Sequence, residues 1–184
     1  AGSKLAVKMF DTTTETWNPL NPEDSNSLYV STGNANGMSA VNQYGSTQRC
    51  SMAFDSFNSP YIAFSEAGMI PYVKKFNETA WETVGTGAVS GDFAAAVGLA
   101  IDANDKPWLV YAKLAATNSS TGNMTLYGFN GGTWSLVTNN PIPTVGVRHT
   151  NIAVRDNNSI CIAYFNTGSS NRATAILYNK TTNV

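Results

Sequence analysis

Three aspartates, Asp55, Asp102 and Asp156, recur along the chain at intervals of 47 and 54 residues. A recurring set of carboxylates could bind a metal ion or work as an acid–base pair on a glycosidic bond. Two of the three are followed by an Asn-containing turn that ends in proline, at Pro60 and Pro107. Because one aspartate recurs in each copy of a repeated pattern, we interpret all three as turn-forming residues.

Other catalytic groups are sparse in this sequence. His149 is the single histidine, and no Ser or Cys nucleophile stands beside it in a recognised spacing. The chain has no calcium-loop pattern, no zinc-ligand spacing and no phosphate-binding glycine loop followed by a helix. The sequence therefore predicts a protein that is not an enzyme and that needs no metal or other cofactor.

Internal repetition is the most informative feature of the chain. Each copy has an alternation of small and large residues that ends at an aspartate, then a turn, then an apolar run. The copies are residues 51–64, 98–111 and 151–164. A period of two predicts strands with two different faces. The alanine-rich residues 93–101 align with the first strand of a copy, and we expect a strand there rather than a helix.

A second pattern alternates with these copies. An apolar run ends in Asn or Asp, and a tryptophan comes four to six residues later, at Trp17, Trp81 and Trp134. A fourth run ends at Asn179 without such a tryptophan. Each full repeat therefore predicts four short strands joined by hairpins. The distance from Trp17 to Trp81 is 64 residues, against 53 for the next interval, which places an insertion in the first repeat.

Four strands per repeat with a recurring tryptophan is typical of a β-propeller blade. The repeats resemble the blades of bacterial-type secreted β-propellers, whose shared pattern is S-L-A-x-D-x-x-x-x-P-Y-I-A-Y, then Y-V-x-K-F-N-x-x-x-W. The resemblance covers residues 49–178 well and 5–17 in part. It implies an all-β fold, a β-propeller or a partial β-propeller of four-stranded antiparallel blades with about three to four repeats. The chain is then one domain, residues 1–184, with approximate units 1–47, 48–92, 93–146 and 147–184.

The expected strands number two, four, four and three in the successive units. Propellers usually close with four to eight blades, and an open stack exposes sheet edges. Either the chain is a segment of a longer protein, or copies associate so that one strand finishes another copy's blade. Residues 5–10 are a candidate for the missing fourth strand of the last blade. Alternatively, residues 28–30 and 40–41 in the insertion supply strands that close a compact ring of four units.

Five residues are candidates for ligand contact. Tyr61 and Trp108 occupy one position of the repeat, where the third copy has Cys161; a framework position would tolerate that change poorly, so a partly exposed role in ligand contact is open beside a framework role. Arg49, and Arg148 with His149, precede the innermost strands, which places them near one mouth of a propeller's central channel. The recurring tryptophans could stack on sugars, but their place in every repeat favours packing between blades.

Composition limits the function classes. Charged residues make up 12% of the chain, Lys and Arg number 11 against 12 Asp and Glu, and Ser, Thr and Asn supply nearly a third of the residues. With no basic run to neutralise phosphates, the chain is not expected to bind nucleic acid. Its longest apolar run is nine residues, too short for a membrane span. Cys50 and Cys161 form one disulfide or remain two thiols, and sequons begin at Asn77, Asn118, Asn123, Asn157 and Asn179.

Low charge with abundant Ser, Thr and Asn is common in secreted and cell-surface β proteins. We therefore expect an extracellular or cell-surface module that does no catalysis. The first hypothesis is a self-assembling or adhesive subunit, such as a fibre or scaffold component, which associates by completing strands or blades. The alternative is a lectin that binds glycans at sites between blades.

Overall fold

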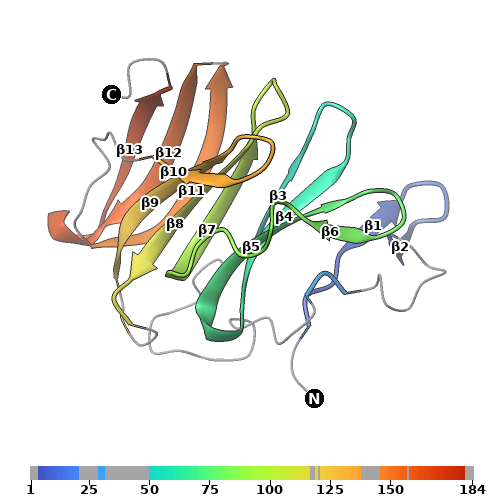
Figure 1. Cartoon of the computed structure of the whole chain (residues 1–184), viewed down its shortest axis with the longest axis horizontal. Coiled ribbons are helices and arrows are strands. Elements are labelled where there is room, and N and C mark those ends of the chain that lie inside the picture. The colour runs from blue at the N-terminus through green and yellow to red at the C-terminus, as the bar shows by residue number, and fades with distance from the viewer. Residues whose placement is uncertain are drawn as a thin grey trace.

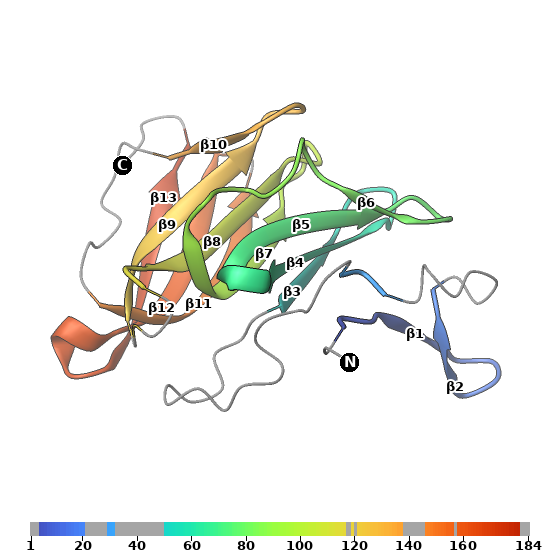
Figure 2. The same ribbon diagram turned by 60° about the horizontal axis from the view of Figure 1, so that its bottom comes forward.

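Thirteen antiparallel strands and two short 3₁₀ turns make up the described part of the chain (Figure 1). The computed structural model describes residues 4–20, 29–31, 50–116, 119, 121–137, 146–156 and 158–180. The strands fall into units of two, four, four and three, which confirms the predicted all-β fold of four-stranded antiparallel blades. The units follow one another across the molecule in chain order (Figures 1 and 2).

The two complete units are four-stranded meanders, which we call blade I and blade II. Blade I contains β3 (Cys50–Phe54), β4 (Pro60–Glu66), β5 (Ile70–Phe76) and β6 (Trp81–Thr83), with the turn η1 (Ala67–Met69) between β4 and β5. Blade II contains β7 (Phe93–Ile101), β8 (Pro107–Leu114), β9 (Gly122–Phe129) and β10 (Trp134–Leu136). The alanine-rich segment Phe93–Ile101 is a strand, as predicted.

The two incomplete units lie at the ends of the described chain. The N-terminal hairpin contains β1 (Lys8–Asp11) and β2 (Thr16–Pro19). Blade III contains β11 (Val147–Asp156), β12 (Ser159–Asn166) and β13 (Arg172–Asn179), with the turn η2 (Thr167–Ser169) between β12 and β13. A single pair, Val147 with Gly122, joins blade III to blade II as one sheet.

The strand register repeats from blade to blade. In each blade, one row of paired residues crosses the first three strands. The first strand contributes an alanine, the second an aromatic residue or a cysteine, and the third a residue that varies between blades. These cross-strand rows are Ala53–Tyr61–Lys75, Ala100–Trp108–Gly128 and Ala153–Cys161–Leu177. The repeat alignment made from sequence therefore holds in three dimensions, residue for residue, through the first three strands.

The turns between first and second strands are organised by the recurring aspartates. Asp55 Oδ1 accepts backbone N–H groups of Phe57 and Ser59 at 3.0 and 2.8 Å. Asp102 Oδ1 accepts those of Asn104 and Lys106 at 3.0 and 3.1 Å. In blade III, Asp156 Oδ1 accepts the Asn158 N–H at 2.8 Å. The predicted turn-forming role of the three aspartates is confirmed, because each carboxylate satisfies N–H groups that the turn leaves without a strand partner.

The hydrophobic core is divided into layers between units, because alternate side chains of each strand face opposite neighbours. Leu5 and Val7 pack against Ile62 and Phe64 of blade I. The opposite face of blade I meets blade II, and the opposite face of blade II meets blade III, in two further layers. We call the two faces of a unit its preceding face and its following face, after the neighbour in chain order.

Small residues allow the inner strands of neighbouring blades to approach closely. A Cβ at Gly98 of β7 would lie 3.4 Å from the Asn151 Cα of β11. Ser51 Oγ of β3 accepts the Leu99 N–H at 3.0 Å. In both cases a larger side chain would separate the strands. The predicted role of the small positions, close approach of a neighbouring sheet, is confirmed at these two.

Four other expectations can be compared with the described residues. The described strands do not close a ring, and the structure is a partial propeller. Tyr29 forms one isolated bridge with Ala6, whereas Leu28, Ala40 and Val41 lie outside the described residues. Cys50 and Cys161 do not form a disulfide with each other. Within the residues described, no helix has the length and hydropathy of a membrane span.

The assignment of residues 5–10 as a fourth strand is wrong. β1 pairs with β2 in a hairpin, and the ring centroids of Phe10 and Trp17 are 5.3 Å apart. The same register and the same centroid distance join the third and fourth strands of both complete blades, through Phe76–Trp81 and Phe129–Trp134. β1 is therefore a third strand and β2 a fourth strand.

Candidate functional site

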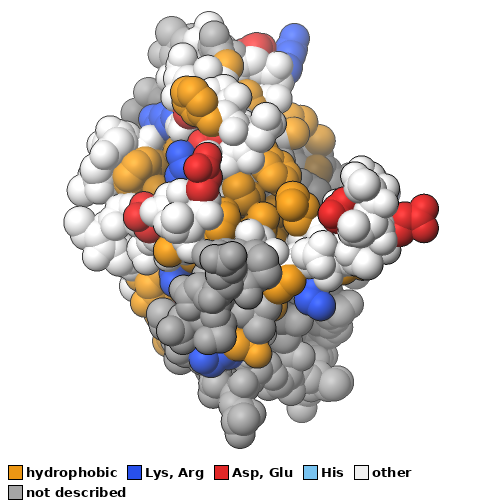
Figure 3. Space-filling view, turned by 90° about the vertical axis from the view of Figure 1, so that its right-hand side faces the viewer, with side chains coloured by type: hydrophobic (Ala, Val, Ile, Leu, Met, Phe, Trp, Pro, Cys, Tyr) orange, Lys and Arg blue, Asp and Glu red, His pale blue; other side chains and the backbone are white. Residues whose placement is uncertain are grey.

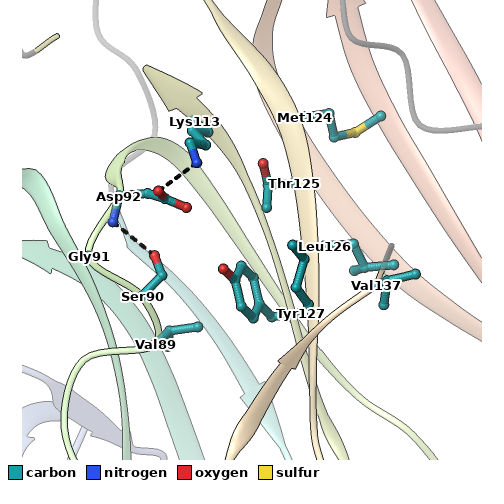
Figure 4. A pocket seen from close by; sticks show the side chains of 11 residues that line it. Val89, Ser90, Gly91, Asp92, Lys113, Met124, Thr125, Leu126, Tyr127 and Val137 are labelled. Carbon is teal, nitrogen blue, oxygen red and sulfur yellow. Dashed lines mark hydrogen bonds and ion pairs between the residues drawn. The ribbon is translucent and has the colours of Figure 1, made fainter. Parts of the chain in front are cut away.

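A cavity of about 550 Å³ opens beside β9, where the segment that leads from blade I into β7 faces blade II (Figure 4). This volume is in the range of small-molecule binding sites. The polar side chains of its wall come from that connecting segment and from β8 and β9 of blade II. Its described lining is Val89, Ser90, Gly91, Asp92, Lys113, Met124, Thr125, Leu126, Tyr127, Leu136 and Val137.

A closed ring of hydrogen bonds holds the polar wall in place. The Tyr111 hydroxyl donates to Asp92 Oδ2 at 2.9 Å, and Ser90 Oγ lies 2.8 Å from the same hydroxyl. Since Tyr111 gives its one proton to Asp92, Ser90 is the donor in the second bond. Ser90 Oγ in turn accepts the Asp92 N–H at 3.2 Å. Tyr111 is fully buried, so the ring is anchored in the core between blades I and II.

Lys113 supplies the positive charge of the site. Its Nζ lies 2.7 Å from Asp92 Oδ1, and the two side chains are 50% and 20% exposed. The hydrogen bond with Asp92 is the main reason that the pKa of Lys113 is raised above its ordinary value. Burial, before any other cause, raises the pKa of Tyr111 well above its usual range, so this hydroxyl stays a hydrogen-bond donor.

Tyr127 gives the cavity an aromatic wall. Its ring stacks on Tyr111 with centroids 6.0 Å apart and planes 11° from parallel. In Figure 4 its ring lies on the same side of β9 as Ser90 and Asp92, with Thr125 beside it. Stacking on a fully buried neighbour fixes the ring's orientation, and Tyr127 is half-buried at the cavity.

This arrangement suits a neutral ligand with several hydroxyl groups. A carboxylate accepts hydrogen bonds and an ammonium group donates them, so Asp92 and Lys113 together match adjacent hydroxyls of one ligand. The Tyr127 ring offers an apolar contact beside them. Their mutual ion pair leaves this pair of groups with no net charge, so an anionic or cationic ligand gains little from it.

Tyr61 and Trp108, two of the predicted contact residues, lie in the layers between blades. Their side chains are 6% and 5% exposed, so the expected partial exposure is wrong. Lys75 covers the Tyr61 ring at 5.2 Å, and Lys106 covers that of Trp108 at 4.4 Å. The Trp108 indole N–H also donates to Asp102 Oδ2 at 3.0 Å. Ligand contact at these two residues stays a prediction, and it requires the blades to separate.

Arg148 and His149 lie at a bulge in β11, and Arg49 lies outside the described residues. His149 is exposed, has a left-handed φ of 50°, and meets the edge of Phe165 with ring centroids 5.6 Å apart. Ala96 occupies the same repeat position in β7 and has the same conformation, with φ of 51°. The bulge is therefore a feature of the repeat. No described contact joins these residues to the Asp92 cavity, and their ligand role stays a prediction.

Sequence reasoning missed Asp92, Lys113 and Tyr127. The repeat does contain a signal, because these residues break it. Glu66 and Asn166 occupy the Lys113 position in the other blades, and Lys74 and Ile176 occupy that of Tyr127. A group of residues present in one repeat only is not required by the fold. Among the described residues, no three His, Cys, Asp or Glu side chains gather into a group that could hold a metal.

Comparison with known proteins gives distant structural likenesses only. No protein-family model matches the chain, and no curated protein matches it in sequence. A fucose lectin from Kordia zhangzhouensis, in complex with methyl-fucoside, is similar with a TM-score of 0.46 and 8% identity, over 71% of this chain and 92% of the lectin. A GH43 endo-arabinanase from Bacillus licheniformis is similar with a TM-score of 0.43 and 9% identity, over 97% of this chain and 64% of the enzyme. Both TM-scores are below 0.5, so neither likeness assigns a function to this chain.

Proposed function

We propose that this chain is a carbohydrate-binding β-propeller module that binds neutral glycans in the Asp92–Lys113–Tyr127 cavity without turning them over. The observation that carries the proposal is the hydrogen-bond ring that fixes Asp92 beside Lys113 and an oriented tyrosine. Sugars are recognised by paired donors and acceptors together with an apolar contact, and the cavity provides all three.

A glycan array followed by calorimetry tests the proposal. We expect saturable binding of neutral glycans by the native chain. Tyr127→Ala and Lys113→Ala should each weaken binding at least tenfold, because each removes one of the three elements of recognition. Lys106→Ala is the matched control for charge, since Lys106 lies outside the cavity lining and binding should not change. Silence across the array from a folded chain would refute the proposal.

Binding without turnover is the second part of the proposal. Asp92 is the one carboxylate in the described cavity lining, and glycoside hydrolysis ordinarily uses two. Incubation with chromogenic glycosides, including arabinosides, should therefore release no product above that of an Asp92→Asn variant. If the native chain releases product and the Asp92→Asn variant releases none, the chain is an enzyme. An extracellular location fits glycan binding and remains part of the proposal.

Self-assembly is a second candidate function. It is favoured by a different set of observations, at the two ends of the blade stack, and it does not depend on the cavity. A chain that assembles would present the cavity in several copies, which strengthens weak binding to repeated glycans.

A further inference from the structure

The N-terminal hairpin corresponds to the outer two strands of a blade. In blade I the third strand, β5, pairs with β4 on one edge and β6 on the other. In the hairpin, the described partners of β1 and Ala6 are β2 and Tyr29. The Val30 N–H donates to the carbonyl of Leu5. In blade I the Val89 N–H makes the equivalent bond to the carbonyl of Pro71, on the edge of β5 that pairs with the fourth strand. Residue 30 therefore also lies on the fourth-strand side of the hairpin. Among the residues described, the inner edge of β1 has no strand partner.

A cavity of about 510 Å³ lies along this inner edge. One wall is the segment of residues 5–8, the other is β3 with Ile62, and Leu99, Asn151 and Ile152 complete it. In blades I and II this place, between a third strand and the next blade's first strand, is filled by inner strands. Among the residues described, this blade position is unfilled.

Large apolar side chains face this unfilled position. Met52 and Phe54 of β3 are 43% and 57% exposed, whereas Leu99 and Ile152, which occupy the Met52 position in β7 and β11, are buried. Figure 3 looks at this end of the molecule and shows hydrophobic side chains gathered at its centre. Trp17 is also exposed, at 63%, although its counterpart Trp134 donates its indole N–H to the preceding blade.

The opposite end of the stack carries the complementary surface. Inside the chain, the small residues of one inner strand cover the large residues of the next, as Ser51 and Ala53 of β3 do for β7. The residues of β11 at those two positions, Asn151 and Ala153, are exposed. On the same following face of blade III, Phe165 and Leu177 are also exposed. One end of the stack thus exposes large apolar residues of an inner strand, and the other end exposes the smaller residues that cover such residues inside the chain.

The geometry points to one way of joining these ends. β1 and β13 are both third strands, with Phe10 at the position of Tyr178 and Met9 at that of Leu177. Two third strands cannot pair with the same edge of β12. We propose that two copies of this chain associate by strand exchange, in which β1 and β2 of one copy replace β13 on β12 of the other and complete a four-stranded blade.

The exchange gives up the β12–β13 pairs, the burial of Tyr178 and the Lys180–Asp102 ion pair, and it adds burial at both open ends. β12 loses eight residue pairs with β13 and gains a third strand from β1, and β2 then supplies the fourth strand that blade III lacks among the described residues. The new blade lies between blade II of one copy and blade I of the other. It covers Met52 and Phe54 with β11, and it brings Trp17 against a preceding blade. The exposed groups of β2, β3, β11 and β12 named above then have the neighbours that their repeat equivalents have inside the chain.

Disulfide trapping tests the register of this exchange. Cys161 of β12 lies opposite Leu177 of β13, so after exchange it lies opposite Met9 of the other copy. In a Cys50→Ser background, Met9→Cys should give covalent dimers and larger species with oxidised glutathione, because directly opposite residues in antiparallel strands are within disulfide reach. Light scattering of the native chain should show a mass at least twice that of the 19.6 kDa monomer.

Two matched variants decide the outcome. Leu177→Cys should close a disulfide with Cys161 within one chain, hold β13 in place and reduce the native assembly to monomer until a reductant is added. Lys8→Cys places the thiol on the other face of β1 and should give no covalent dimer. The proposal is overturned if Met9→Cys yields no intermolecular product while Leu177→Cys closes, if Lys8→Cys cross-links equally, or if the native chain is monomeric at all concentrations.

Discussion

The Lys180 ammonium group lies 2.8 Å from Asp102 Oδ2 and joins the end of blade III to the first turn of blade II. In blade I the corresponding aspartate, Asp55, is paired at 2.8 Å with Lys75 of its own third strand. Gly128 occupies the Lys75 position in blade II, and the Trp108 ring lies against it. The repeat thus keeps the ion pair and changes the blade that supplies the lysine.

Removal of the Asp102 charge should destabilise the fold more than removal of the Asp55 charge. Asn keeps the side-chain oxygen that organises each turn, so the substitution isolates the ion pair. Lys180 is 13% exposed and would lose its counter-charge in a mostly buried site, so Asp102→Asn should cost about 3 kcal/mol in the free energy of unfolding of the unexchanged monomer. Lys75 is more exposed, and Asp55→Asn should cost about 1–2 kcal/mol.

Urea unfolding measures both. Asp156→Asn, which weakens only an exposed pair with Arg155 at 3.7 Å, is the control and should change stability by less than about 0.5 kcal/mol. Equal costs for all three would contradict this account.

Stability should fall in acid because of the same aspartates. Burial raises the pKa of Asp102, but hydrogen bonds from Lys180 and Trp108 outweigh it, so the pKa is lowered overall. Asp55 behaves likewise, with Lys75 as its main partner. A carboxyl whose pKa is lower in the folded state stabilises the fold fully above its unfolded value, about 3.9, and loses this contribution as the pH falls through the folded value. The melting temperature should therefore be steady near neutral pH and drop below about pH 4. An Asp102→Asn chain should show a shallower drop, and an unchanged profile in that variant would exclude Asp102 as a cause.

Gly128→Ala should destabilise blade II. The added Cβ would lie 2.8 Å from Trp108 Cζ3, in a ring held by its hydrogen bond to Asp102 and covered by two lysines. Because the ring cannot move aside without breaking that bond, we expect a cost of about 1–3 kcal/mol. Gly132→Ala is the control, since nothing lies within 4 Å of its added Cβ. Thermal unfolding of the two variants side by side measures the difference, and equal melting temperatures would show that Trp108 can shift.

Trp134→Phe should weaken the contact between blades I and II. The indole N–H of Trp134 donates to the Val84 carbonyl at 2.9 Å, across 50 residues of sequence. Loss of this bond leaves a carbonyl without its donor and should cost about 1 kcal/mol, with a further loss of packing. Trp17→Phe changes an exposed tryptophan at the equivalent position. It should have little effect on the unfolding free energy of the monomer. A loss of stability equal to that of Trp134→Phe would contradict the claim that only Trp134 is bonded to a neighbouring blade.

The sequence predicted the strands well because their physical causes are local. Alternation of small and large residues, an aspartate at the turn and a tryptophan after a hairpin all act within a few residues. For the same reason the repeats revealed which residues of one blade correspond to those of the next. Residues 93–101 show the limit of propensity, since their alanines alone would suit a helix and the repeat alignment decides for a strand.

The candidate site was not predictable in the same way. Asp92, Tyr111 and Tyr127 are separated by up to 35 residues, and each is unremarkable in its own segment. They meet because the segment that leaves blade I passes over the face of blade II, which no local pattern specifies. The burial of Tyr61 and Trp108 has a similar origin, because the covering residues come from another strand or loop.

The sequence by itself determined the repeat, its strand order and the turn chemistry, since these depend on side chains close together along the chain. Only the tertiary structure decided between the two roles that the sequence allowed for residues 5–10, third strand or fourth strand, and only it showed that Lys180 takes the part of Lys75 for Asp102. It also decided which faces of the stack lie open. These outcomes depend on which blades become neighbours, and that choice is made by packing between segments far apart in the sequence.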